Sequence, residues 1–239
     1  MAIELCMVMP VYNEVACVAG VVGAWREMLE RLGVEFRMLV LNDGSTDGTE
    51  TALRPFEDDG RIDLISKQNS GHGPTILEGY HRAVELADWV FQCDSDDEMK
   101  PGHFPALWAK RDEYDALFGV RVGRRQSPTR GLISAVSRLT VRMLFGSGVC
   151  DVNTPYRLMR AALLREIIVQ IPPDTFAPNV IISGAFARAG KRILNTPVPH
   201  EGRRTGAVSV VKWRLWRAVI KAFWQTLLCR PVVKGVSAL

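Results

Sequence analysis

Short apolar runs and stretches of helical periodicity alternate through the first half of the chain. The apolar runs have the length of strands, and they cover residues 3–9, 36–41, 62–65, 89–93 and 116–120. Between them, apolar positions recur every three or four residues, which predicts helices over residues 14–32, 74–86 and 103–111. Strands that alternate with helices in this way indicate a parallel sheet, in which ligands bind at the carboxyl ends of the strands.

Polar loops fall where the apolar runs end, and they cover residues 10–14, 42–45, 67–74 and 94–98. We find no internal repeat, low-complexity tract or interdomain linker, and 239 residues are enough to bury a substantial core. The chain is therefore predicted to form one α/β domain over residues 1–210, a mostly parallel sheet flanked by helices. An extension over residues 211–239 follows it.

The segment 94–98 places four carboxylates in five positions directly after a predicted strand. Like charges this close repel one another, so the cluster is costly unless a cation offsets it. In an extended segment Asp94, Asp96 and Glu98 point to the same side, where they can share one hard divalent ion. The pattern favours Mg²⁺ or Mn²⁺ bound together with substrate phosphate, and a solvated acidic turn is the alternative.

Two other loops also carry candidate ligand contacts. Asp43 is positioned to accept hydrogen bonds from a nucleobase, whereas the same segment can simply form a turn in which Thr46 or Asp47 caps the next helix. Gly71 and Gly73 allow the backbone to approach a ligand closely. Neither GxGxxG nor GxxxxGK(S/T) occurs, which argues against a dinucleotide fold and a P-loop.

Composition narrows the function classes further. Hydrophobic residues make up 47% of the chain, which excludes a disordered or fibrous protein. Five cysteines without a CxxC pair indicate reduced thiols in a cytoplasmic protein, and four histidines without metal-ligand spacing argue against a zinc site. The start lacks a signal-peptide pattern, and no apolar stretch approaches the ~20 residues that span a bilayer. Nucleic acid is not expected as a partner, because the acidic cluster would repel phosphate unless metal is present.

Taken together, the loops resemble those of family 2 glycosyltransferases with the GT-A fold. The matching segments are PVYNE (10–14), NDGSTDGT (42–49) and DSDDE (94–98), whose order and spacing agree over about the first 120 residues. The resemblance implies a nucleotide-sugar donor and a metal. The implied site residues are Pro10, Tyr12, Glu14 and Asp43 for base and ribose, Gly71 and Gly73 for the donor loop, and Asp94, Asp96 and Glu98 for metal and diphosphate.

Within this family, the likeness is greatest to the dolichol-phosphate mannosyltransferase and polyprenyl-phosphate sugar transferase branch. It rests on segments 71–73, 119–121, 151–157 and 203–206, whereas Asn42, Pro155 and residues 207–209 depart from the branch's pattern. The implied reaction is attack of a lipid phosphate oxygen on the anomeric carbon, with inversion and loss of nucleoside diphosphate. The residues that would bind the two phosphates are Arg121, Arg157, Arg203 and Arg204.

The acceptor decides whether the reaction needs a general base. A phosphate monoester is already largely dianionic at neutral pH, since its second pKa is ~6, and it needs none. A saccharide or glycolipid hydroxyl in cell-envelope polysaccharide synthesis, the alternative acceptor, would need a base, and Asp97 is the nearest candidate. A non-catalytic nucleotide-sugar binding module at a membrane is a further alternative.

The segment 212–230 bears on the acceptor as well. Its aromatic and aliphatic residues recur at helical spacing with Lys, Arg and Gln between them, which is typical of a helix lying in a membrane interface. A helix that packs on the core or forms a dimer is the alternative. The stretch 132–145 is similarly amphipathic. We therefore predict peripheral attachment to the cytoplasmic face of the membrane, with a membrane subunit or a homo-oligomer left open.

Overall fold

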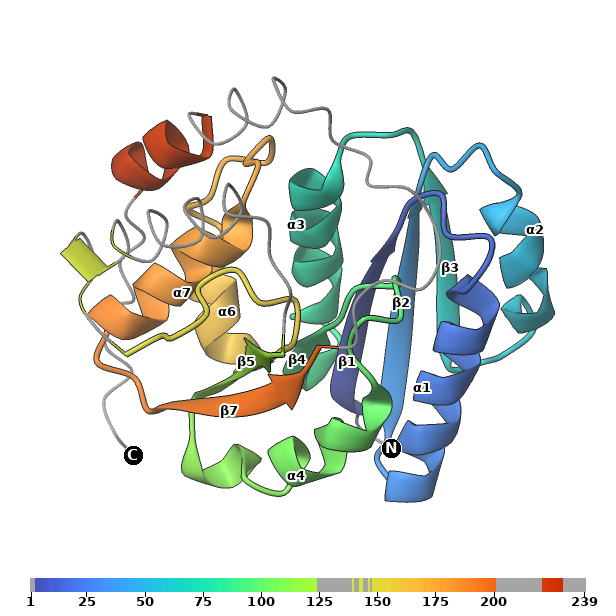
Figure 1. Ribbon diagram of the computed structural model, residues 1–239, viewed down its shortest axis with the longest axis horizontal. Coiled ribbons are helices and arrows are strands. Elements are labelled where there is room, and N and C mark those ends of the chain that lie inside the picture. Colours follow the sequence, from blue (N-terminus) through green and yellow to red (C-terminus); the bar gives the residue numbers. More distant parts are fainter. Residues whose placement is uncertain are drawn as a thin grey trace.

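The computed structural model describes residues 3–123, 139, 142–143, 146, 148–200 and 221–229. In this part of the chain seven strands form one sheet in the order β3-β2-β1-β4-β6-β5-β7 (Figure 1). The strands are β1 (Ile3–Val11), β2 (Phe36–Asp43), β3 (Ile62–Lys67), β4 (Ala87–Gln92), β5 (Ala116–Val122), β6 (Arg157–Arg160) and β7 (Ile193–Pro199). Among them β6 is antiparallel to both of its neighbours, and the other pairs are parallel. The predicted mostly parallel α/β sheet is confirmed.

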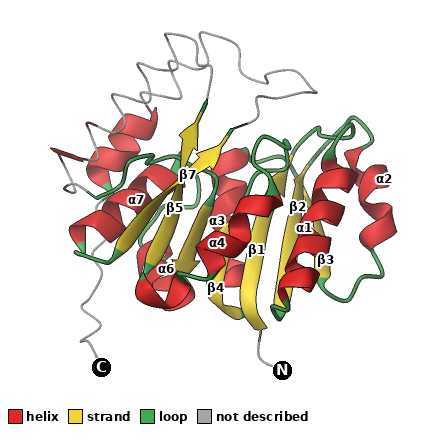
Figure 2. Cartoon of the chain, turned by 60° about the horizontal axis from the view of Figure 1, so that its bottom comes forward, coloured by secondary structure: helices red, strands yellow, loops and turns green. Residues whose placement is uncertain are grey.

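Helices cover both faces of this sheet (Figure 2). One layer contains α1 (Val18–Leu32), α2 (Thr49–Leu53) and α4 (Phe104–Trp108), and the other contains α3 (His72–Ala83), α6 (Ala161–Ile168) and α7 (Pro178–Arg188). Short 3-10 turns flank α2 and α4, namely η1 (Arg54–Phe56), η2 (Pro101–His103) and η3 (Arg111–Glu113). Because both faces are covered, the central strands bury side chains on both sides and are continuously apolar in sequence.

Each face of the sheet has its own hydrophobic core. On the α1 face, Trp25 is fully buried and its ring packs against Phe91 and Phe104. On the other face, α3 lies very close to β1 at Gly79. A β-carbon added at this glycine would be only 2.4 Å from Val8 Cγ1. This close packing holds α3 firmly against the strand whose carboxyl end it approaches.

Three local details can be compared with the sequence predictions. The helix predicted from residue 14 begins only at Val18, and the Glu14 N–H donates to Thr49 Oγ1 at the start of α2. The helix predicted over 103–111 is divided into η2, α4 and η3 by 3-10 hydrogen bonding. The N-cap of α2 is Gly48 rather than the predicted Thr46 or Asp47, although Asp47 Oδ1 accepts the N–H of Thr49 at 3.0 Å.

All five cysteines are free, and their exposure varies: two are buried, two are partly buried and Cys150 is exposed. None of the described helices is long and apolar enough to cross a membrane. The boundary predicted between residues 210 and 211 lies outside the described residues, as does most of the stretch 132–145.

Candidate active site

The carboxyl ends of β1, β2 and β4 meet the first turn of α3 around a pocket of about 430 Å³. This edge of a parallel sheet is where such folds bind their ligands. Seven residues predicted from the sequence line the pocket, namely Pro10, Tyr12, Glu14, Asp43, Gly71, Asp94 and Asp96. Its other lining residues are Val11, Asn69, His72, Thr75, Ser95 and Phe176. The fold therefore gathers loops that are far apart in the sequence.

Asp43 ties the loop after β3 to the end of β2. Its side chain is buried and accepts hydrogen bonds from the N–H groups of Ser70 (2.8 Å) and Gly71 (2.9 Å) and from Lys67 Nζ (2.9 Å). Burial would raise the pKa of Asp43, but these hydrogen bonds outweigh it and lower the pKa below its ordinary value. Asp43 is thus an ionised carboxylate in the pocket wall, and its contact with a nucleobase stays a prediction.

The two loops predicted to hold a nucleoside also hold each other. The N–H of Asn13 donates to Ser45 Oγ (2.9 Å), and the N–H of Thr46 donates to Asn13 Oδ1 (2.8 Å). Asn13 adopts a left-handed φ of 55°, which asparagine tolerates better than most residues. Part of the polar pattern in these segments therefore serves the contact between the loops, alongside any contact with a ligand.

The acidic segment 94–98 bends after β4, and its side chains diverge. Asp94 and Asp96 both line the pocket. Asp97, with a φ of 60°, forms an ion pair with Lys100 and lines a neighbouring pocket of about 430 Å³ along α1, which Asp96 also borders. The segment is bent rather than extended as the prediction assumed, yet Asp94 and Asp96 still line one pocket.

Glu98, the third predicted metal ligand, lies beside His200 rather than in the pocket. Glu98 Oε2 is 2.7 Å from His200 Nε2. Both ring nitrogens of His200 are buried, yet neither makes a well-oriented hydrogen bond within the described residues. Among all the residues that the structure describes, no three His, Cys, Asp or Glu side chains are grouped closely enough to hold a metal ion. A metal bound at this edge would therefore rely on Asp94 and Asp96 together with oxygen atoms of a ligand and water.

Arg121, near the carboxyl end of β5, forms a bidentate ion pair with Asp151. Its Nε and Nη2 atoms lie 2.7 Å and 2.8 Å from the two carboxylate oxygens of Asp151. Burial would raise the pKa of Asp151, but the hydrogen bonds and charge of Arg121 outweigh it and lower the pKa. Arg121 does not line the pocket, so its catalytic role stays a prediction. Arg203 and Arg204 lie outside the described residues.

Arg157 lies in the core rather than at the pocket. Its side chain is fully buried, and the guanidinium donates to the carbonyls of Val152, Thr154 and Asn179 and to Ser183 Oγ, at 3.0–3.3 Å. Burial lowers the pKa of Arg157, but an arginine remains charged at neutral pH. Because the protein occupies this guanidinium, the structure does not place Arg157 where a phosphate clamp would need it.

Phe176 and His200 lie outside the loops that the sequence marks as site candidates. Phe176 lines the pocket from the loop before α7, and no local signal marks it, because the loop reaches the pocket only through the fold. His200 directly follows β7. A polar residue at the end of a strand is a usable signal, but residues 193–199 were not recognised as a strand.

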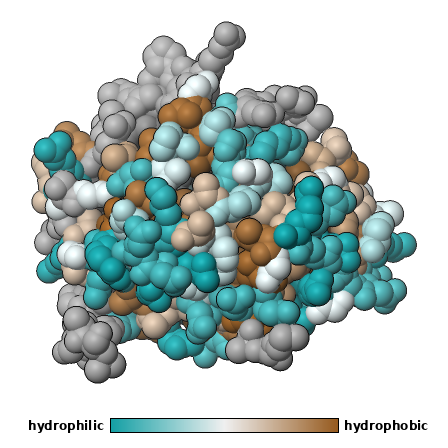
Figure 3. All heavy atoms as spheres, turned by 90° about the horizontal axis from the view of Figure 1, so that it is seen from below, coloured by the Kyte–Doolittle hydropathy of each residue, from teal (hydrophilic) through white to brown (hydrophobic). Residues whose placement is uncertain are grey.

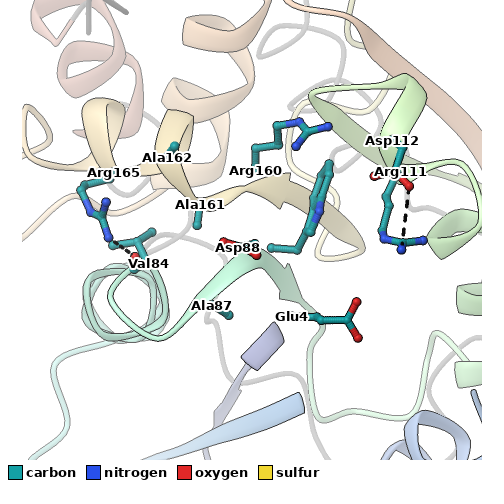
Figure 4. Close-up of a pocket in the computed structure, with 11 residues that line it drawn as sticks. Glu4, Val84, Ala87, Asp88, Arg111, Asp112, Arg160, Ala161, Ala162 and Arg165 are labelled. Atoms are coloured by element: carbon teal, nitrogen blue, oxygen red, sulfur yellow. Dashed lines mark hydrogen bonds and ion pairs between the residues drawn. The ribbon is translucent and has the colours of Figure 1, made fainter. Parts of the chain in front are cut away.

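A third pocket, of about 420 Å³, lies near the amino ends of β1 and β4 (Figure 4). It is lined by equal numbers of acidic and basic side chains, Glu4, Asp88, Asp112, Arg111, Arg160 and Arg165. Arg160 lies over the Trp89 ring at 4.6 Å, and Arg165 donates to the carbonyl of Val84. This end of the molecule is mainly hydrophilic, with small hydrophobic patches (Figure 3). The acidic and basic side chains of this pocket balance one another, whereas the pocket at the carboxyl ends of β1, β2 and β4 is lined by Asp43, Asp94 and Asp96. We therefore assign the candidate active site to the pocket at the carboxyl ends.

The family profile described as "Glycosyl transferase family 2" matches residues 6–168, more than half of the chain. The chain belongs to this family. It is therefore a glycosyltransferase that uses a nucleotide sugar, and the matched residues include each strand end that surrounds the candidate active site.

Solved structures with a similar fold include glucosyl-3-phosphoglycerate synthase from Mycobacterium tuberculosis in complex with phosphoglyceric acid. That match has a TM-score of 0.71 and 17% identity, over 99% of this chain and 83% of that chain. The same synthase with Mn²⁺, UDP and phosphoglyceric acid matches with a TM-score of 0.69 and 18% identity, over 99% of this chain and 81% of that chain. S. aureus TarS 1–349 with UDP-GlcNAc matches with a TM-score of 0.61 and 18% identity, over 94% of this chain and 66% of that chain. At these identities the likeness shows the fold alone, which is the GT-A glycosyltransferase fold.

Proposed function

We propose that this family 2 glycosyltransferase moves a sugar from a GDP- or UDP-sugar to a polyprenyl phosphate, with inversion, like the dolichol-phosphate mannosyltransferase branch that its sequence resembles. The observation that supports the donor site is the pocket in which the two predicted nucleoside loops meet Asp94 and Asp96. In this proposal the base and ribose lie against Tyr12 and Asp43, and the diphosphate lies toward Asp96.

Mg²⁺ or Mn²⁺ is the cofactor that this function requires. The donor set fits such an ion, because Asp94 and Asp96 line one pocket and Mg²⁺ is usually held by one or two carboxylates plus phosphate and water oxygens. When bound, the cation offsets the negative charge that develops on the departing nucleoside diphosphate. The complex of the similar synthase with Mn²⁺ and UDP supports the same kind of cofactor here. A role for Glu98 in this site stays a prediction.

A lipid acceptor is supported by exposed apolar residues near the end of the described chain. Residues 221–228 are helical, and Phe223 and Trp224 are 41% and 54% exposed. Exposed aromatic rings beside a cation such as Lys221 suit a membrane interface. Peripheral attachment to the cytoplasmic membrane face follows from the same pattern. Residues 212–220, which carry the rest of it, lie outside the described residues.

The ion pair between Asp97 and Lys100 agrees with a phosphate acceptor, because such an acceptor needs no general base. A saccharide or glycolipid hydroxyl is the second candidate acceptor, and it would require Asp97 to leave Lys100 and act as the base. The likeness to a synthase in complex with phosphoglyceric acid supports this second candidate about as well as the first.

Transfer assays with radiolabelled nucleotide sugars separate these acceptors. The full chain, with Mn²⁺, would be offered undecaprenyl phosphate in phospholipid vesicles, oligosaccharides or phosphoglyceric acid in parallel. We expect label in the lipid fraction. Label only in a soluble product would refute the polyprenyl phosphate acceptor and leave the donor site intact.

Thermal unfolding with a panel of nucleoside diphosphates tests the donor pocket independently of the acceptor. A ligand that binds only the folded state raises the melting temperature. We expect a rise with one nucleoside diphosphate, and a larger rise when Mn²⁺ is present. No rise with any of them would count against the pocket.

A further inference from the structure

We infer that Gln225 positions Phe176 in the donor pocket and that the Phe176 ring contributes directly to donor binding. The inference rests on the proposed function, because it takes the ligand of the pocket to be a nucleotide sugar. It adds one positioning residue and one specificity-determining residue, neither of which lies in the motif loops.

Phe176 supplies an apolar surface to a pocket that is otherwise rich in polar side chains. The residue is 44% exposed and lines the pocket together with Thr75, His72 and Asp94. An aromatic ring in this position offers a flat apolar contact to a nucleobase or to the apolar face of a sugar. Such a contact depends on the ring's position, so whatever holds the loop that carries Phe176 also affects binding.

On one side, the backbone of this loop packs directly against α3. A β-carbon added at Gly73 would lie 2.2 Å from the carbonyl oxygen of Thr175 and 2.4 Å from that of Phe176. Both distances are far inside van der Waals contact, so only glycine fits here. Gly73 is therefore needed for the approach of two backbone segments of the protein, and it does not itself line the pocket.

On the other side, the helix 221–228 holds the same loop. Gln225 Oε1 accepts a hydrogen bond from the N–H of Phe176 at 2.9 Å, and Lys221 Nζ lies 2.9 Å from Asp174 Oδ2. Figure 1 shows this red helix beside the orange loop that precedes α7. The loop is thus fixed between α3 and the helix, and Gln225 bonds the backbone of the residue that carries the ring.

Substitutions at Gln225 can separate this positioning from folding, because one partly exposed hydrogen bond contributes little to global stability. Gln225→Leu removes the acceptor with little change in volume, whereas Gln225→Glu retains an oxygen that can accept the Phe176 N–H. Both variants lose the Nε2 that donates to the carbonyl of Asp174 at 3.4 Å, so only the Phe176 hydrogen bond differs between them. Leu228→Ala, at an 80% exposed position of the same helix, is the matched control.

Donor KM, kcat and the hydrogen exchange of the peptide containing Phe176 would be measured for each variant. In Gln225→Leu we expect donor KM to rise on the order of three- to tenfold, with kcat nearly unchanged and faster exchange at Phe176. Gln225→Glu and Leu228→Ala should stay close to the wild type. If Gln225→Glu behaves like Gln225→Leu, the hydrogen bond is not the cause and the inference is overturned.

The ring itself is tested by Phe176→Ala, for which donor KM should rise on the order of tenfold. Adding Gln225→Leu to Phe176→Ala should raise KM no further, because no ring remains to be positioned. Unchanged KM in Phe176→Ala, or additive effects in the double variant, would each overturn the inference.

Failure of the proposed function would look different. If the wild type binds no nucleoside diphosphate in the presence of Mn²⁺, the proposed function fails, and the donor-binding part of the inference fails with it. Hydrogen exchange would still show whether Gln225 holds Phe176. If the wild type and Phe176→Ala bind equally tightly, only the inference fails.

Discussion

The charged residues near β1, β2 and β4 have different surroundings from those near β5 and β6. At the ends of β1, β2 and β4, Asp94 and Asp96 border a pocket that a ligand can enter. Around β5 and β6, Arg121 is paired with Asp151 and Arg157 is buried among carbonyl groups. Both sets stood out in the sequence as site candidates. The difference shows that a charged residue near a strand end indicates a site only when the protein leaves it facing a cavity.

The largest expected effect is at Asp96. Asp96→Asn removes a carboxylate from the pocket, and transfer should fall on the order of 1000-fold, which corresponds to several kcal/mol of lost transition-state stabilisation. The adjacent Asp97→Asn is the matched control, because Asp97 is paired with Lys100 and faces the neighbouring pocket. It should retain most activity with a phosphate acceptor. Equal losses of initial rate in the two variants would break the distinction between the pockets.

Arg157 should affect stability rather than the site. Arg157→Ala leaves buried carbonyls without their donor and opens a cavity, so the free energy of unfolding in urea should fall by about 3–5 kcal/mol. Arg121→Ala, at a partly exposed ion pair, should cost about 1 kcal/mol. An Arg157→Ala protein with wild-type stability and no transfer activity would return this residue to the catalytic machinery.

The contact between the motif loops should have an intermediate effect. Asn13→Ala removes a side-chain acceptor and places alanine at a positive φ, so unfolding should become easier by about 2 kcal/mol. Ser45→Ala removes one acceptor without changing the backbone requirement and should cost about 1 kcal/mol. Calorimetric titration should show weaker nucleoside diphosphate binding in both variants. Unchanged affinity would mean that the hydrogen bonds between the two loops do not affect ligand binding.

The smallest effect is expected in acid. The pKa values of Asp43 and Asp151 are lowered in the folded protein, so their stabilisation is complete above the unfolded-state pKa of ~3.9 and is lost as the pH falls through the lower folded-state value. The melting temperature should therefore drop below about pH 4. Scanning calorimetry should find a shallower drop in Asp43→Asn. If the melting temperature fell equally steeply with pH in the variant, the ionised Asp43 would not stabilise the folded protein.

The α/β class and most of the pocket were predictable because they depend on local patterns. Apolar runs of strand length located β1 to β5, and the polar loops at their ends are the loops that meet at the pocket. Parallel strands bring their carboxyl ends to one edge, so residues such as Tyr12, Asp43 and Asp96 could be grouped without knowing how the helices pack.

What the residue order alone determined is therefore the sequence of strands and the chemistry at their ends. Long-range packing decided the rest. The antiparallel β6 between β4 and β5, the burial of Arg157 and the approach of Phe176 to the pocket all depend on segments distant in the chain. Local sequence reports periodicity and residue type, but whether a polar group meets a carbonyl, a cavity or water is settled only when the chain has closed around it.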